Sequence, residues 1–229
     1  MGQWATDWNR LRRIAPILLA LGVAGCSSLL HSDAPPVQVY TLRAAPAAAT
    51  ADPRPAAMAS LRVAHPLAGP GLGTSQIVLL QPDHRMSVYA ASEWAADAPV
   101  LIGSLATQTL RASGDWSSVQ DAESPFPARY LLQISIRRFD ADYPAGAGVP
   151  PTVHVTLQCT LGSEDAREVL ASFAAAGSAA AGANRLSDVV AAFQRATDQA
   201  LRSMSQQAFA ALKASPGRSG PATSAGAGR

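Results

Sequence analysis

Alternating apolar and polar positions predict the strands of this chain. The alternation is strict in residues 130–139 and 152–161, and a period of two places every second side chain on the same face of a strand. The apolar face of these two segments comprises Tyr130, Leu132, Ile134, Ile136, Val153, Val155, Leu157, Cys159 and Leu161. Shorter segments predict further strands at 37–42, 61–63, 77–80, 86–89, 116–120 and 168–173. Pro82 and Asp83 favour a turn, so 77–80 and 86–89 are expected to form a hairpin.

A period near 3.6 predicts two helices. In residues 186–214 one stripe of apolar and small side chains recurs at this period, with Ser187 or Asn184 near the N-terminal cap. That stripe consists of Leu186, Val190, Phe193, Thr197, Ala200, Met204, Ala208 and Leu212. Another helix is predicted to open at Ser92-Glu93-Trp94, with Ser92 as N-cap, and to end at Gly114. Its stripe contains Trp94, Leu101, Leu105 and Gln108.

These elements predict one α+β domain over residues 37–214. Two helices would cover one face of a mainly antiparallel sheet. The Ala/Pro-rich residues 43–59 lack the large apolar side chains of a core and are expected to form a loop, as are residues 66–73. Residues 215–229 are rich in Pro, Gly, Ser and Ala, a composition typical of a disordered tail.

The first 26 residues have the layout of a secretion signal. Arg10, Arg12 and Arg13 precede the uncharged apolar run 14–23, which is too short for the roughly 20 residues that a membrane-spanning helix needs. Val23-Ala24-Gly25-Cys26 then resembles the lipobox of bacterial lipoproteins, with Val23 where Leu is usual. The alternatives are an ordinary signal peptide that ends in a cysteine, or a buried helix, but neither explains why the three features coincide.

This resemblance predicts a signal peptide over residues 1–25 and cleavage between Gly25 and Cys26. Cys26 would carry diacylglycerol and an N-acyl chain such as palmitate, and several acyl chains anchor a protein more firmly than one. Residues 26–36 would then be a lipidated tether, of which 27–36 reach about 35 Å when extended. Ser27, where an Asp would signal retention at the inner membrane, favours the periplasmic side of the outer membrane.

Charge and cysteine content agree with this interpretation. The formal net charge of +2 falls to zero once residues 1–25, with three Arg and one Asp, are removed, so the basic character belongs to the signal. No remaining stretch combines clustered basic residues with aromatics, which argues against nucleic-acid binding. Acylation of Cys26 leaves Cys159 without a disulfide partner in the chain, and its place on an apolar strand face predicts a core residue.

Motifs for catalysis or metal binding are not found. None of the four histidines has metal-ligand spacing to other ligand types, and the neighbours Asp83 and His84 are interpreted as a solvated turn pair; the histidines are His31, His65, His84 and His154. No Gly-x-Ser-x-Gly elbow occurs, and Gly69, Gly71 and Gly73 lack the lysine of a phosphate loop. We therefore expect no enzyme, no metal and no cofactor beyond the acyl chains.

Two further pairs of residues have a structural and a functional interpretation. Asp140 and Asp142 point the same way at a strand end and are expected to form a solvated acidic edge rather than a site. Trp94 and Trp116 would suit a lipid groove, but aromatic residues at such positions are more often part of the core.

The order of these landmarks resembles the ABC-type transport auxiliary lipoproteins, the PqiC-like partners of MCE-type lipid transporters. The matching features cover nearly the whole mature domain. They are Tyr40-Thr41-Leu42, Leu61-Arg62-Val63, Ile77-Val78, 86–89, Trp94 with the helix through Leu101 and Leu105, 131–139, the next alternating strand and the Ala-rich C-terminal helix.

The resemblance implies a non-enzymatic lipoprotein that docks an MCE protein at the outer membrane while phospholipid moves between the two membranes. The alternative is an outer-membrane assembly lipoprotein that binds a β-barrel partner, as in lipopolysaccharide export. The C-terminal helix would either form a homo-oligomer contact or simply cover the sheet. Partner-contact residues, the transported lipid and the oligomeric state are left open.

Overall fold

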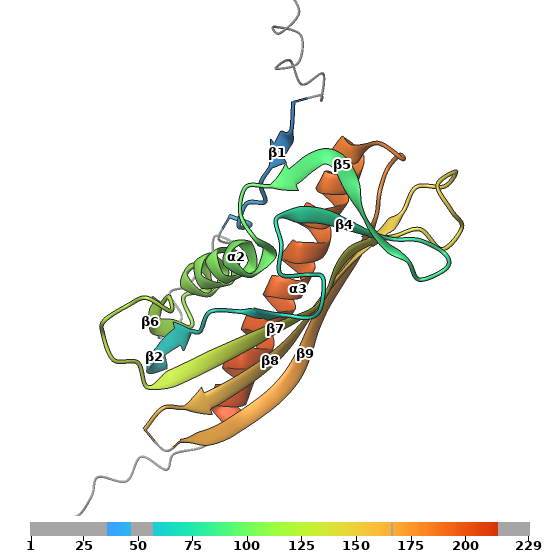
Figure 1. Cartoon of the computed structure of the whole chain (residues 1–229). Helices are drawn as coiled ribbons and strands as arrows, with labels where there is room; N and C mark the ends of the chain where they lie inside the picture. Colours follow the sequence, from blue (N-terminus) through green and yellow to red (C-terminus); the bar gives the residue numbers. More distant parts are fainter. Residues whose placement is uncertain (1–35, 47–56, 166, 215–229) are drawn as a thin grey trace, which may run out of the picture. The chain divides into compact units, whose positions relative to one another are not determined.

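The central strand of the sheet is β7 (Tyr130–Asp142). The computed structural model describes residues 36–46, 57–165 and 167–214 (Figure 1). One edge of β7 pairs antiparallel with β8 (Thr152–Ser163), and β8 pairs antiparallel with β9 (Glu168–Ala180). The two strictly alternating segments therefore lie side by side in the sheet.

Three short strands follow one another along the other edge of β7. They are β2 (Ala57–Val63), β3 (Leu67–Ala68) and β4 (Gln76–Leu80), and all run parallel to β7. Beyond them, the outer strands are β6 (Trp116–Gln120) beside β2, β5 (Met86–Trp94) beside β4, and β1 (Gln38–Tyr40) beside β5. The described residues thus form a mixed sheet of nine strands, and the α+β class is confirmed.

A bulge in β7 keeps its apolar side chains in the core. The pairing register with β8 shifts between Ile136 and Arg138, because β7 has one extra residue there. The extra residue changes the face to which the following side chains of β7 point. Ile136 and Phe139 are consequently both buried although they are three residues apart.

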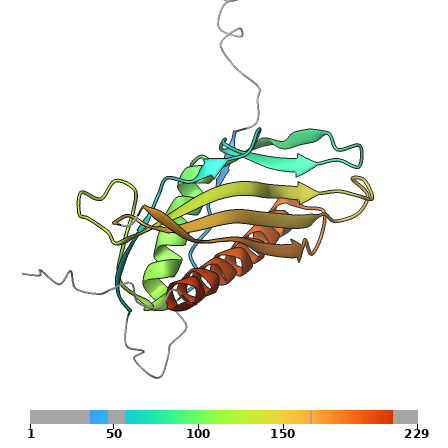
Figure 2. The same ribbon diagram turned by 90° about the horizontal axis from the view of Figure 1, so that it is seen from below.

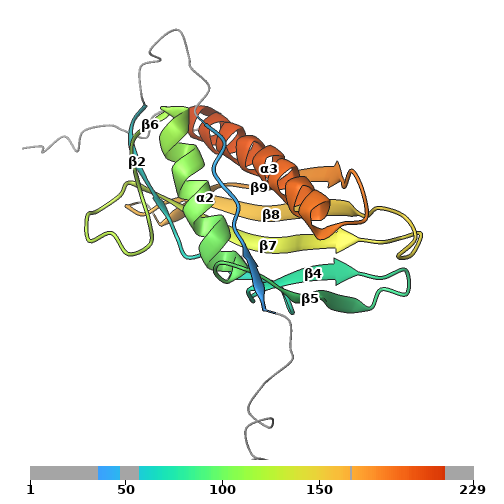
Figure 3. The same ribbon diagram turned by 90° about the horizontal axis from the view of Figure 1, so that it is seen from above.

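The two helices lie on the same face of the sheet, as Figures 2 and 3 show from opposite sides. Helix α3 (Leu186–Ala214) packs over β8 and β9, and α2 (Ala98–Ser113) packs over β2, β3 and β6. The predicted bounds of α3 are confirmed, and most of its predicted stripe is buried. Gly114 ends α2 in the left-handed conformation that favours glycine (φ 68°).

An aromatic cluster joins both layers of the domain. Trp94 at the end of β5, Phe139 of β7 and Phe193 of α3 are at most 2% exposed. The ring centroid of Phe193 lies 5.0 Å from that of Trp94 and 5.0 Å from that of Phe139, within the range in which aromatic pairs attract each other. This contact fixes α3 to the middle of the sheet.

Gly177 of β9 allows α3 to approach the sheet closely. A Cβ atom at this position would lie 2.0 Å from the carbonyl oxygen of Ala196 and 2.9 Å from the backbone nitrogen of Ala200. Both are backbone atoms of α3, so a side chain at position 177 would push the whole helix away from the sheet.

Side chains of α3 also protect the outer edge of β9. Gln207 donates a hydrogen bond to the carbonyl oxygen of Ala174, and Gln199 accepts one from the backbone N–H of Ser178. Arg195 donates to the carbonyl oxygen of Ala180 at 2.8 Å. The helix therefore occupies backbone groups that another strand would otherwise pair with.

The predicted start of α2 is wrong. Ser92 and Trp94 belong to β5, because this part of β5 pairs with β1 and the N–H of Trp94 donates to the carbonyl oxygen of Ser75. The helix begins at Ala98 after Asp97, with proline in the first turn. The predicted stripe is wrong at Gln108, which is exposed, whereas Leu101 and Leu105 are buried.

Smaller corrections concern the predicted loops and a cap. The loop over 66–73 contains β3, which two hydrogen-bonded residues suffice to form, and residues 57–59 of the Ala/Pro stretch belong to β2. Asn184 does not cap α3, because its side chain accepts a hydrogen bond from Tyr143 and donates one to the carbonyl oxygen of Ala147. The predicted signal, the tether up to residue 35, residues 47–56 and the tail lie outside the described residues.

Candidate functional site

The predicted lipid-attachment and cleavage residues, Cys26 and Gly25, lie outside the described residues, so their assignment stays a prediction. Within the described residues, no helix has the length and the apolar character needed to cross a membrane.

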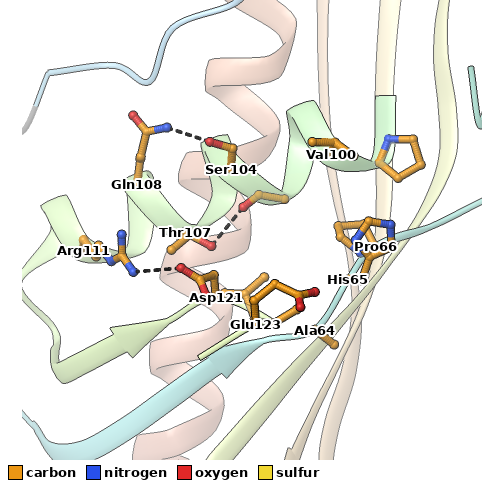
Figure 4. Close-up of a pocket in the computed structure, with 14 residues that line it drawn as sticks. Ala64, His65, Pro66, Val100, Ser104, Thr107, Gln108, Arg111, Asp121 and Glu123 are labelled. Atoms are coloured by element: carbon orange, nitrogen blue, oxygen red, sulfur yellow. Dashed lines mark hydrogen bonds and ion pairs between the residues drawn. The ribbon is translucent and has the colours of Figure 1, made fainter. Parts of the chain in front are cut away.

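A groove of about 580 Å³ runs along α2. Its floor is the segment that leaves β2, one wall is the exposed side of α2, and the other wall is the start of the loop after β6 (Figure 4). The lining residues are Val63, Ala64, His65, Pro66, Pro99, Val100, Gly103, Ser104, Thr107, Gln108, Arg111, Asp121, Ala122 and Glu123.

Gly103 places the helix wall directly above the floor of the groove. A Cβ atom there would lie 3.0 Å from the Cδ atom of Pro66, so a larger residue would have to lift α2 from this segment. Pro66 itself is buried, and the contact makes the floor apolar.

Polar groups on the helix wall are bonded within the helix. Thr107 donates its hydroxyl to the carbonyl oxygen of Gly103 at 2.9 Å, and Gln108 donates to the hydroxyl of Ser104 at 3.0 Å (Figure 4). Val100 on the same wall is 50% exposed. The wall therefore presents an aliphatic side chain beside amide and hydroxyl groups whose hydrogen bonds are partly satisfied.

The far wall is acidic. Arg111 donates from Nε to the carbonyl oxygen of Val119 at 2.9 Å, and its Nη2 lies 3.7 Å from Oδ2 of Asp121. Both side chains are more than half exposed, so solvent weakens this ion pair. Glu123 adds a second exposed carboxylate, and Arg111, Asp121 and Glu123 together have a formal charge of −1. Such a groove can accept an aliphatic side chain flanked by a basic one.

The predicted solvated acidic edge is wrong for Asp140. Arg138 binds both oxygens of Asp140, from Nε at 3.1 Å and from Nη2 at 2.7 Å, and its Nη2 also lies 3.1 Å from Asp142. Asp140 is only 6% exposed. Hydrogen bonds to Asp140 raise the pKa of Arg138 above its usual value, against the opposing effect of partial burial. The sequence interpretation omitted Arg138, although its position two residues before Asp140 was the available signal.

The histidines of the described residues are not brought together. His65 lies at the rim of the groove, His84 occupies the hairpin turn with a positive φ of 61°, and His154 pairs with Asp140 across two strands. Among the described residues, no group of three or more His, Cys, Asp or Glu side chains could hold a metal ion.

Core positions were predicted correctly for three notable side chains. Trp94 and Trp116 are 1% and 5% exposed, which confirms the core interpretation over the lipid-groove one. Cys159 is fully buried, and burial raises the pKa of its thiol to about 12. At neutral pH the thiol is therefore protonated and a poor nucleophile.

A chain of hydrogen bonds at the hairpin end of the domain was not predicted. The hydroxyls of Tyr89 and Tyr143 lie 2.7 Å apart, and Tyr143 donates to Oδ1 of Asn184 at 2.7 Å. Burial and the bond to Tyr143 raise the pKa of Tyr89. The three residues are far apart in sequence, and single polar residues in separate segments give no signal of their pairing.

Solved structures show the same fold. A crystal structure of a Xanthomonas campestris protein of the DUF330 family matches 79% of this chain and 98% of that chain, with 22% identity and a TM-score of 0.68. A second crystal structure, of an uncharacterized protein, matches 76% of this chain and 99% of that chain, with 12% identity and a TM-score of 0.59. No curated protein matches the sequence significantly.

The sequence itself identifies the family. A family model described as the ABC-type transport auxiliary lipoprotein component matches residues 40–205. This match begins at the last residue of β1 and ends within α3, so it includes β2 to β9 and α2 completely. The chain therefore belongs to the ABC-type transport auxiliary lipoprotein family.

Proposed function

We propose that this lipoprotein is the outer-membrane-anchored, non-enzymatic component of an MCE-type system that moves phospholipids between the inner and outer membranes. It would dock the MCE protein at the outer membrane. The observation that supports this proposal most directly is the family match over residues 40–205. The lipobox-like Val23-Ala24-Gly25-Cys26 and the following Ser27 support the anchor and its membrane.

The groove beside α2 is the proposed contact for the MCE protein. Its apolar floor at Pro66 and the half-exposed Val100 favour an aliphatic side chain of the partner. Its acidic wall at Asp121 and Glu123 favours a neighbouring Lys or Arg. The groove would thus bind one aliphatic and one basic side chain of the partner, and a few such residues can supply most of the binding free energy of an interface.

Isolation of the lipoprotein with its partners from the membranes of its own host tests the proposal. After cross-linking in the cell, we expect an MCE protein to be recovered with the full lipidated chain. Recovery of only a β-barrel protein would overturn the proposal and support an outer-membrane assembly role.

Two matched variants test the groove. Val100→Asp places a charge on the apolar wall and is expected to lower MCE recovery at least tenfold. Val149→Asp is the control, because Val149 is also 50% exposed but lies outside the groove. Equal recovery with both variants would remove the groove from the contact and leave the family role in place.

The anchor has its own test. Cys26→Ser is expected to leave an unprocessed or soluble chain without acyl mass, as measured by mass spectrometry and membrane fractionation. A variant that still carries diacylglycerol would contradict the assignment. Density-gradient separation of the unmodified protein should place it with outer-membrane markers, and fractionation with the inner membrane would refute that location.

A further inference from the structure

The sheet face opposite the two helices, here called the outer face, has a polar half and an apolar half. In β8 and β9 the outer face consists of small and polar side chains, among them His154, Thr156, Gln158, Thr160, Ser172 and Ser178. The opposite half of the sheet, made by β1, β3, β4 and β5, differs sharply in character. Nine large apolar side chains of the described residues are exposed, and five of them lie in these strands or directly before β1. The five are Val37, Val39, Leu67, Met86 and Val88. We call these five residues the outer apolar patch.

Strand pairing places β1 and β3 of this patch on the outer face. Tyr40 pairs with Trp94 and both contact the core, so the preceding Val39 points to the outer face. Leu67 pairs with Ser135, whose two neighbours in β7 are fully buried in the core. Val39 and Leu67 are each 60% exposed.

The β4–β5 hairpin completes the patch. Leu79 pairs with Ala141 of β7, which is fully buried under the helices, so the neighbouring Val78 and Leu80 point to the outer face. Their partners Val88 and Met86 point there with them. A Cβ atom on Gly71 would lie 2.6 Å from Sδ of Met86, which shows that the loop after β3 lies against the patch. Val78 itself is only 3% exposed, so neighbouring side chains cover it, whereas Met86 and Val88 remain exposed.

The predicted anchor brings this patch near a membrane. Ten residues, 27–36, separate Cys26 from Val37, and a ten-residue chain spans about 35 Å at most. Val37 and Val39 are the first apolar residues of the domain after that tether. The turn of the hairpin adds no net charge, because Arg85 lies 3.8 Å from Asp83. Glu93 of β5, the strand partner of Val39, contributes one carboxylate to this edge. A surface with several exposed aliphatic side chains suits the interface of a phospholipid bilayer.

We propose that the outer apolar patch rests on the phospholipid bilayer into which the Cys26 acyl chains insert. The proposal rests on the predicted anchor, and it adds an orientation: the β1–β5 edge faces the lipid. Helix α2 lies on the opposite, helix-covered face of the sheet (Figure 3). The groove beside α2 therefore remains accessible to a partner in the periplasm.

The test uses the full lipidated chain in vesicles of phosphatidylethanolamine and phosphatidylglycerol (3:1), with no other protein present. A fluorophore is attached at Val88→Cys or Val169→Cys, and quenching by lipids with brominated acyl chains is measured. Val169 is the matched position, since it is 62% exposed on an edge strand but lies in the polar half of the sheet. Cys159 is fully buried and does not compete for the label.

We expect at least threefold stronger quenching at position 88 than at position 169. Adding Val39→Asp and Met86→Asp to a chain labelled at Leu67→Cys should reduce quenching at position 67 to the level of position 169. These side chains are between 47% and 60% exposed, so their replacement leaves the fold intact, which a thermal melt checks.

Equal, weak quenching at positions 88 and 169 in a chain that carries acyl mass would overturn the proposal. Shielding of position 88 only after an MCE or β-barrel protein is added would also overturn it, in favour of a protein contact. A chain without acyl mass would remove the anchor and the orientation together. None of these outcomes depends on whether the groove binds an MCE protein, so the two proposals fail separately.

Discussion

The two faces of one sheet have opposite roles in this molecule. On the face that carries α2 and α3, side chains such as Leu132, Ile134 and Val155 are fully buried. On the other face, the same strands carry side chains that are exposed or only partly buried, apart from Asp140 beneath Arg138. Because side chains alternate along these strands, one face stabilises the domain and the other remains available for contacts.

Substitutions on the two faces should therefore differ in their effect on stability. Changes on the covered face should lower the free energy of unfolding, and changes on the outer face should leave it nearly unchanged unless they leave a buried charge without its partner.

Phe193→Ala should have the largest effect, because it removes the ring that contacts Trp94 and Phe139. We expect a loss of about 3–5 kcal/mol in the free energy of unfolding, measured by urea denaturation. Phe126→Ala is the control, since Phe126 is 68% exposed, and its effect should stay within about 0.5 kcal/mol. Similar losses for both variants would contradict the role of the aromatic cluster in stabilising the domain.

Gly177→Ala should destabilise the domain by about 1–3 kcal/mol or more, because its methyl group would collide with the backbone of α3 at Ala196. Gly148→Ala introduces the same atom where no neighbour lies within 4 Å. Thermal unfolding of both variants measures the difference. A melting temperature unchanged by Gly177→Ala would mean that α3 does not lie as close to β9 as described.

Arg138→Met tests the exception on the outer face. Without Arg138, the buried carboxylate of Asp140 has lost its bidentate partner, and we expect a loss of about 1–3 kcal/mol. The double variant Arg138→Met/Asp140→Val should recover most of this loss, because no charge is then left unpaired. If the double variant is as unstable as the single one, the ion pair is not the cause.

Cys159 should have the smallest effect, visible only at high pH. Burial raises the pKa of its thiol to about 12 in the folded chain, against about 8.5 when unfolded. The unfolded state therefore loses its proton first, and stability should decline as the pH rises from about 9 towards 12. Cys159→Ala should abolish this part of the decline, and maleimide should label Cys159 at pH 8 only in denaturant. Rapid labelling of the folded chain would contradict its burial.

Much of the fold could be predicted because its signals are local. The alternation in 130–139 and 152–161 and the stripe in 186–214 depend on neighbouring residues, and the structure confirms these elements. The start of α2 could not be predicted from Ser92, because its β5 conformation depends on pairing with β1, more than fifty residues earlier in the chain. Local capping patterns cannot detect such a partner.

The groove and the outer apolar patch were beyond sequence reasoning for the same reason. The groove joins Pro66, Val100 and Asp121, which three separate segments bring together. The patch depends on which of two strand faces receives the helices, and alternation in β5 alone does not decide that. The burial of Asp140 was missed because the bulge at Ile136–Arg138 changes the local geometry without any glycine or proline to mark it.

The hydrogen bonds from α3 to β9 are relevant to the proposed acylated form of this chain. Acylated proteins diffuse in two dimensions, where copies of the same chain meet often and in similar orientations. An unpaired edge strand on one copy could then pair side by side with the edge strand of another copy, and the two sheets would join. Arg195, Gln199 and Gln207 occupy backbone groups of β9 at Ala174, Ser178 and Ala180. Within the described residues, α3 therefore hinders strand pairing between copies of this chain at the β9 edge.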